Sequence, residues 1–288
     1  MRQRSGFFVP LTVLAVLLCF VQGYLFRDFW FDEALTVLNF ALSEPVSNIY
    51  FNYPIPNNHI VYTLLLRFWI ELQPASIDPV VWMRLLSVIF AGATLFLLYR
   101  LFRSQFGGVL MLPVLPATAA SVPFLVYATA VRGYMLSALL VTIALRFALD
   151  YARSGSGKTL AGYAAACFLT TGAIPSNLAA LGGVVLYALP LCGSKFLHRR
   201  RFWILALTPA SFWGAYIQLC TKFTFAPNPI PSPARGRMGQ RVGRTACRAC
   251  GFSLQLRHAA DSGDGLHPRL RPRPVQLALV RAGDDLAA

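Results

Sequence analysis

Three carboxylates stand among four aromatic rings in the stretch FRDFWFDE, residues 26–33. A carboxylate held in place can take the proton of an attacking hydroxyl group, and such general base catalysis is typically worth about 10²–10⁴-fold in rate. Because successive helical residues point in different directions, Asp32 and Glu33 cannot both face one site. We expect one to be the base and the other to orient or cap the segment. The simpler alternative is that Asp32 only caps a helix that begins at Glu33 or Ala34.

The composition places these carboxylates in a membrane protein. The 288 residues are 56% hydrophobic and only 13% charged, well above the apolar content of an ordinary soluble domain. The run from Phe7 to Phe26 offers about 20 uncharged residues, enough to cross a hydrocarbon core of roughly 30 Å. Its length and the lack of a small-x-small cleavage site favour an uncleaved anchor over a signal peptide.

Further apolar blocks predict an all-α fold, a polytopic transmembrane helical bundle of about seven spans. The blocks cover residues 80–102, 108–127, 133–151, 160–174, 177–192 and 202–220. Short breaks that contain Gly, Pro or Arg separate them. The blocks 160–174 and 177–192 are short and rich in Ala and Gly, so they are either tilted, closely packed helices or one hairpin.

Basic residues indicate the orientation, because Lys and Arg accumulate in cytoplasmic loops. With seven alternating spans, one side receives Arg2, Arg4, Arg100, Arg103, Arg153, Lys158, Lys195, Arg199, Arg200 and Arg201. This side is the predicted cytoplasmic side, where the N-terminus also lies. The acid-rich loop 27–79 then lies outside the cytoplasm.

The segment HIVYTLLLRFWIEL, residues 59–72, is apolar enough to suggest another span, but counting it would place the later basic clusters outside. Its polar residues instead recur at every fourth position, at His59, Thr63, Arg67 and Glu71. This period puts them on one helical face opposite an apolar face. We therefore expect an interfacial helix here and a similar one over Ala34–Leu42.

Four motifs in order carry a resemblance to a known family. After the N-terminal span come FDEALTVL, PIPNNHIVYTLLLRFW, RLLSVIFAGATLFLLYRLF and YATAVRGYML. Their order and spacing resemble the polytopic glycosyltransferases of the C superfamily, in particular bacterial protein mannosyltransferases, aminoarabinose transferases and the lipopolysaccharide-core galacturonosyltransferase-like group. The resemblance covers residues 1–220.

The resemblance implies transfer of a sugar from a polyprenyl-phosphate donor to a glycan, lipid or protein acceptor outside the cytoplasm. It implies a bacterial inner membrane location, contact with membrane lipid, and no cofactor beyond the lipid-linked donor. Asp32 matches the family's Asp and is our choice for the base, with Glu33 as its neighbour in the catalytic set. Asn58 and His59 match the family's Asn-His pair.

A phosphate leaving group needs positive charge or hydrogen-bond donors nearby. The residues expected to bind substrate are Asn58, His59, Tyr62, Arg84, Arg132 and Tyr134. Arg132 lies between apolar blocks, so it needs a lipid phosphate, an acid of the first loop, or a path to the interface. The structural alternatives are a snorkelling side chain for Arg84, a hydrogen-bonding one for His59 and a packing one for Tyr62.

Two other motifs are not expected to bind ligands. SGSGKTL lacks the first glycine of a phosphate-binding loop and follows no strand. Cys247 and Cys250 with His258 and His267 do not have the spacing of a zinc site, so no metal is predicted, and a divalent ion with Asp32 and Glu33 has no support in ligand spacing.

The composition changes abruptly in residues 227–288, where Phe252 is the only aromatic residue and Arg, Gly, Pro, Ala and Leu predominate without periodicity. We expect 1–226 to be the membrane domain and 227–288 to be out-of-frame translation, the alternative being a disordered basic tail. Ten of the 26 Lys and Arg residues lie there, so the net charge of +15 does not indicate nucleic-acid binding. A truncated chain could be inactive.

Two other functions stay open. A transporter or lipid-linked sugar translocase would hold charges near mid-membrane at broken helices. The second alternative function is that of a noncatalytic membrane subunit.

The orientation is directly testable with a reporter that is active only outside the cytoplasm. Fused after Ser47 it should be active, and fused after Ser156 it should be silent, because the two positions flank an odd number of predicted spans. The reverse pattern would contradict the placement of Asp32 outside the cytoplasm.

Overall fold

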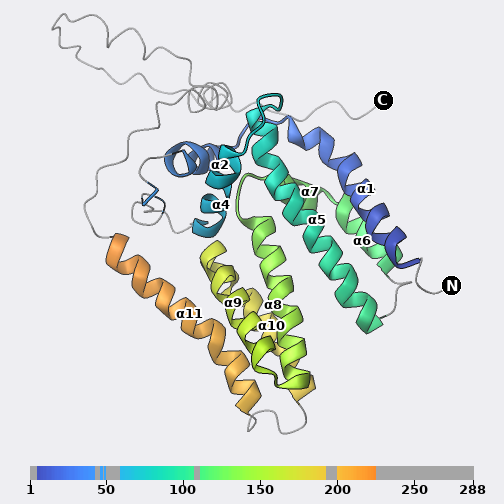
Figure 1. Cartoon of the computed structure of the whole chain (residues 1–288), viewed down its shortest axis with the longest axis vertical. Helices are drawn as coiled ribbons and strands as arrows, with labels where there is room; N and C mark the ends of the chain where they lie inside the picture. The colour runs from blue at the N-terminus through green and yellow to red at the C-terminus, as the bar shows by residue number, and fades with distance from the viewer. Residues whose placement is uncertain are drawn as a thin grey trace, which may run out of the picture. The chain divides into compact units, whose positions relative to one another are not determined.

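Helices are the only regular secondary structure in the residues that the computed structural model describes, which are 5–42, 46–47, 49, 59–106, 111–192 and 200–224 (Figure 1). The longer helices are α1 (Ser5–Leu25), α5 (Pro79–Phe106), α8 (Tyr134–Ser154), α9 (Gly157–Ala173) and α11 (Arg200–Thr224). The shorter ones are α2 (Phe31–Leu35), the π-helical η1 (Thr36–Ala41), α4 (Ile60–Glu71), α6 (Met111–Ala120), α7 (Val122–Thr129), η2 (Pro175–Asn177), α10 (Leu178–Ala188) and η3 (Leu189–Cys192). The predicted helical class is confirmed for these ranges, and the tail 227–288 lies outside them.

Two helices in the described ranges are long and apolar enough to cross a membrane, namely Pro79–Arg103 and Tyr134–Ser154. The stretches Pro10–Leu25 and Pro175–Ala188 are apolar but shorter. These helices have the length and composition of membrane spans. The count of about seven spans stays a prediction.

The predicted block 108–127 is not one continuous helix. It is divided into α6 and α7 at Ser121, whose backbone is extended with φ −70° and ψ 138°. Pro123 explains the break, because proline has no N–H to donate to the preceding turn and is well tolerated only in the first turn of a helix. The Ser121 hydroxyl donates to the Thr118 carbonyl at 2.9 Å and so satisfies an acceptor at the end of α6.

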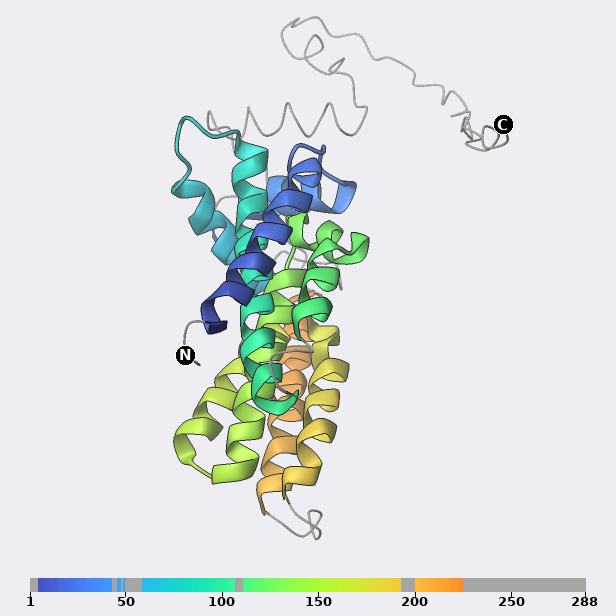
Figure 2. The same cartoon turned by 90° about the vertical axis from the view of Figure 1, so that its right-hand side faces the viewer.

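Three apolar clusters hold the helices together. Figures 1 and 2 show the arrangement of the helices that these clusters join. One joins α1, α5, α6 and α7, and a second joins α8, α9, α10 and α11. In the second cluster the buried Ala144, Ala148 and Ala166 keep the contacting faces of α8 and α9 small, which lets helices approach closely. The third cluster joins α2, η1 and α4 to the first turns of α5 and α8.

The helix predicted over 59–72 is confirmed as α4, with His59 at its N-cap position. The first half of its polar stripe faces the protein, since His59 and Thr63 are buried, whereas Glu71 at the other end is 65% exposed. On the apolar face Phe68 is 61% exposed. An apolar outer face is what a helix in contact with lipid requires. The helix predicted over Ala34–Leu42 is also present, but it begins earlier, at Phe31, and its second part is π-helical.

Two tryptophans fix α4 to the start of α5. The indole N–H of Trp69 donates to the Trp82 carbonyl and that of Trp82 donates to the Trp69 carbonyl, each at 2.8 Å. The two rings stack with centroids 4.2 Å apart. Because each indole N–H donates to a backbone carbonyl of the other helix, α4 and α5 are held as one unit.

Candidate functional site

Glu33 is buried and accepts four hydrogen bonds, which fills both of its carboxylate oxygens. Oε1 accepts from Arg84 Nη1 at 3.3 Å and from the Val131 backbone N–H at 2.6 Å. Oε2 accepts from Arg84 Nη2 at 3.2 Å and from the Trp30 backbone N–H at 2.9 Å. The bond to Trp30 is the capping-box bond of α2, because Trp30 is the N-cap residue and Glu33 the third helical residue. This geometry gives Glu33 a structural role as the ion-pair partner of Arg84.

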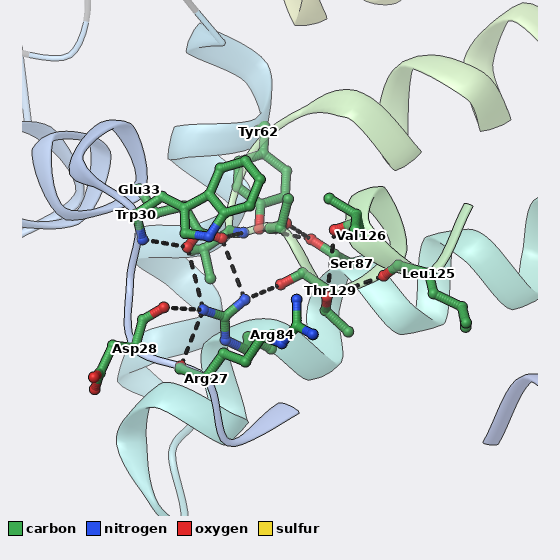
Figure 3. A network of polar contacts seen from close by, with 12 residues as sticks. Arg27, Asp28, Trp30, Glu33, Tyr62, Arg84, Ser87, Leu125, Val126 and Thr129 are labelled. Atoms are coloured by element: carbon green, nitrogen blue, oxygen red, sulfur yellow. Dashed lines mark hydrogen bonds and ion pairs between the residues drawn. The ribbon is translucent and has the colours of Figure 1, made fainter. Parts of the chain in front are cut away.

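Arg84 joins segments that lie far apart in the sequence (Figure 3). Besides Glu33, its Nη1 donates to the Thr129 carbonyl at 2.6 Å. Its Nη2 donates to the carbonyls of Arg27 at 3.2 Å and Asp28 at 3.1 Å. One guanidinium group in the first turns of α5 thus holds the end of α7, the segment after α1, and α2. Both Nη groups are therefore already engaged with protein acceptors.

Asp32 is placed differently from its neighbour. Its side chain is 60% exposed and accepts a hydrogen bond from Arg132 Nη1 at 2.6 Å. Arg132 is itself buried, with 8% of its side chain exposed, and follows α7 in the connection to α8. An acid of the first loop is therefore confirmed as one of the partners expected for Arg132.

The capping alternative for Asp32 does not fit this structure. Helix α2 begins at Phe31 with Trp30 as its N-cap residue, so Asp32 is the second helical residue. The carboxylate that bonds the N-cap backbone belongs to Glu33. The Asp32 side chain is therefore held by an ion pair and open to solvent.

A pocket of about 150 Å³ opens beside Asp32, between the end of α1, α2, α5 and α7. Charged side chains and aromatic rings share its wall: Tyr24, Arg27, Trp30, Asp32, Glu33, Arg84, Tyr127, Arg132 and Tyr134, with Val126, Thr129 and Ala130 completing it. The pocket combines an accessible carboxylate with guanidinium groups and ring faces. Guanidinium groups in such a lining suit a ligand that carries an anionic group.

Two predicted substrate-binding residues, Tyr62 and His59, are buried and do not line this pocket. Tyr62 is fully buried, and because the single hydroxyl hydrogen of Ser87 goes to the Ala130 carbonyl, the Tyr62 hydroxyl donates to Ser87 Oγ at 3.0 Å. Burial raises the pKa of Tyr62 well above its usual range. Asn58 lies outside the described residues.

His59 is also buried, and its protonation state follows from its contacts. Nδ1 lies 3.1 Å from the Ala173 carbonyl oxygen, which can only accept, so Nδ1 carries the hydrogen. Nε2 is buried and has no hydrogen-bond partner in the described ranges. Burial, and after it the positive charge of Arg132, lower the pKa of His59 to about 4. His59 is neutral at pH 7 and contacts Tyr134 edge to face, with ring centroids 5.3 Å apart.

The structure brings to the pocket four charged or aromatic residues that the sequence analysis did not select: Tyr24, Arg27, Trp30 and Tyr127. Arg27 is exposed, and its guanidinium lies 4.0 Å from the centroid of the Tyr24 ring. The position of Arg27 next to the acids, at the end of the first apolar run, was the sequence feature that could have identified it as a pocket residue. Tyr127 gave no comparable signal, because it lies inside an apolar block.

No group of three or more His, Cys, Asp or Glu side chains able to hold a metal ion occurs within the described part of the chain. The cysteines and histidines of the tail lie outside that part.

Comparison of the chain with protein-family models, with curated proteins and with solved structures finds no match.

The structural role of Glu33 can be tested by Glu33→Gln. Each carboxylate oxygen receives two donors, so the amide NH₂ of glutamine would face two donors in either orientation. Removing one partner of a buried ion pair costs roughly 3–5 kcal/mol. We expect a lowered thermal transition in detergent, measured by fluorescence, whereas Glu71→Gln on the exposed side of α4 should change it little. An unchanged transition for Glu33→Gln would contradict the structural role.

The lowered pKa of His59 predicts acid sensitivity. The unfolded chain, with a histidine pKa near 6.5, binds a proton that the folded chain excludes down to about pH 4. Stability should therefore be complete above pH 6.5 and fall as the pH drops from 6.5 towards 4, by up to about 3 kcal/mol. His59→Asn keeps a donor for the Ala173 carbonyl but cannot titrate, so its thermal transition should lose this part of the pH dependence. If the thermal transitions of the wild type and His59→Asn changed equally with pH, His59 would not be the source of the acid sensitivity.

Proposed function

We propose that the chain is an integral-membrane glycosyltransferase that moves a sugar from a polyprenyl-phosphate donor to an acceptor outside the cytoplasm. The observation that carries this proposal is the position of Asp32, which is 60% exposed on the wall of the pocket and ion-paired with the buried Arg132. The motif order that resembles the C superfamily of glycosyltransferases is a second, independent support. The acceptor class, whether glycan, lipid or protein, is left open.

In the proposed reaction an acceptor hydroxyl oxygen attacks the anomeric carbon of the donor sugar. The bond from that carbon to the donor phosphate breaks, and the phosphate leaves with the bonding electron pair. Asp32 accepts the hydroxyl proton as the new bond forms, which is general base catalysis. No redox partner or cofactor is needed, because the phosphate ester already activates the sugar.

The leaving phosphate would be bound by cations of the same pocket. Arg132 lies beside Asp32, and the exposed Arg27 also lines the pocket, with its guanidinium over the Tyr24 ring. Arg84 is the weaker choice among the arginines, because both of its Nη groups donate to protein oxygens. The hydroxyls of Tyr127 and Tyr134 are further donors for phosphate or sugar.

A lipid-linked donor also requires that the carboxylate lie at the membrane surface. In our proposal α5 and α8 cross a bacterial inner membrane with the N-terminus in the cytoplasm, and the pocket lies at their outer ends. The apolar outer face of α4 would rest in the interface beside it. The sugar would then meet Asp32 while the isoprenoid tail stays in the hydrocarbon.

A transporter would be expected to place its charges at a broken helix near mid-membrane. The helix breaks at Ser121 and at residues 174–177 have no charged residue beside them. The buried charges Glu33, Arg84 and Arg132 gather instead near the start of α5. This distribution favours the transferase over the transporter.

Asp32→Asn tests the proposal, because asparagine can still accept a hydrogen bond from Arg132 but is not a proton acceptor. In membranes that contain the chain, transfer of radiolabelled sugar from a polyprenyl-phosphate donor should fall by about 10²-fold or more at equal protein level. Binding of the donor should persist, since no cation is removed. Asp28→Asn is the matched control, because Asp28 is exposed but does not line the pocket. Wild-type transfer by Asp32→Asn would exclude Asp32 as the base.

A further inference from the structure

An apolar groove of about 660 Å³ runs between α1 and α5, away from the carboxylate pocket. Leu11, Leu14 and Leu18 line it from α1, and Ile89, Gly92 and Phe96 line it from α5. All five of the larger side chains are roughly half exposed. Among the described residues, nothing fills this space.

The groove is long enough to hold a lipid chain of one bilayer leaflet. Its lining on α5 extends from Trp82 to Tyr99. With a rise of 1.5 Å per residue this corresponds to about 25 Å along the helix, more than the roughly 15 Å that one leaflet contributes to a hydrocarbon core of roughly 30 Å. At one end stand Trp69 and Trp82, which is the placement preferred by tryptophan at a membrane interface.

The other end of the groove carries two exposed arginines. Arg103 Nη1 donates to the Tyr99 hydroxyl at 3.1 Å. The Arg100 guanidinium lies 6.0 Å from the centroid of the Phe96 ring. Because Tyr99 and Phe96 both line the groove, the two cations are held at its end rather than elsewhere around the helix.

We propose that this groove binds one acyl chain of an anionic glycerophospholipid, with the lipid phosphate at Arg100 and Arg103. The apolar lining accounts for the chain, and the two guanidinium groups account for an anionic headgroup. Sixteen residues of α5 separate Arg84 from Arg100, or about 24 Å. The lipid phosphate therefore lies at the opposite end of α5 from the pocket of Asp32. The proposal requires α1 and α5 to cross a bilayer, and it does not depend on sugar transfer.

Gly92 gives a way to close the groove without touching the arginines. A Cβ atom placed there would meet only the Leu14 side chain, at 3.6 Å, which is ordinary contact. A leucine at this position would extend into the groove. Gly182 on α10 is the matched control, because a Cβ atom there meets no atom within 4 Å and it does not line the groove.

The headgroup part of the proposal is tested by native mass spectrometry of the full chain in detergent, titrated with dioleoyl phosphatidylglycerol or dioleoyl phosphatidylcholine. We expect one tightly bound phosphatidylglycerol and about tenfold weaker binding of phosphatidylcholine. The double variant Arg100→Gln/Arg103→Gln should lose this preference. The matched variant Arg146→Gln/Arg153→Gln, which removes two arginines from α8, should keep it. A preference retained by Arg100→Gln/Arg103→Gln would overturn the proposal.

The chain-binding part is tested by Gly92→Leu, which should weaken binding of both lipids about tenfold, whereas Gly182→Leu should not. Circular dichroism checks that each variant keeps its helices. Equal lipid binding by Gly92→Leu and the wild type would overturn the assignment of the groove. A lipid-free dimer that Gly92→Leu dissociates would also overturn it, because the groove would then be a contact between two copies of the chain.

Discussion

Removing a carboxylate and a guanidinium group from water costs several kcal/mol per ion, and a buried pair is stable only when further hydrogen bonds satisfy its remaining donors and acceptors. The pair of Glu33 and Arg84 largely meets this condition through groups on two stretches that lie far apart in the sequence: the residues from Arg27 to Trp30, which follow α1, and the residues from Thr129 to Val131, between α7 and α8. Of the polar side-chain atoms of the pair, Arg84 Nε alone has no hydrogen-bond partner within the described ranges. The other bonds all form only when both stretches are in place. The arrangement of α2, the start of α5 and the end of α7 depends on this ion pair.

This dependence separates two roles that the sequence puts side by side. Glu33 is fully hydrogen-bonded and has no lone pair free for chemistry, while Asp32 projects from the next position of the same helical turn towards the pocket. Because Glu33 fixes the turn, the position of the Asp32 side chain is set by that turn together with its ion pair with Arg132. A rigid neighbour is what allows an exposed carboxylate to keep a defined position.

The parts of this structure that follow from local pattern were predictable from the sequence. The recurrence of polar residues at every fourth position, at His59, Thr63 and Arg67, predicted α4. The uncharged run before residue 26 predicted α1. The pairing of Glu33 with Arg84 was not predictable, because 51 residues separate them and no local period connects them. The break at Ser121 was missed because hydropathy averages over a window in which one proline changes little, although Pro123 itself was visible. Arg27 was missed as a pocket residue because its orientation depends on the ring of Tyr24.

Under the proposed placement of α5 in a membrane, the reciprocal bonds between Trp69 and Trp82 would affect how the protein responds to lipid. A spanning helix adapts to a bilayer of different hydrophobic thickness mainly by changing its tilt. Since α4 is bonded to the first turn of α5, it must follow that tilt, and His59 at its N-cap position moves with it. His59 contacts Tyr134, and Tyr134 belongs to the pocket wall. If α5 spans a bilayer, as we propose, this series of contacts would couple the position of Tyr134 in the pocket wall to membrane thickness.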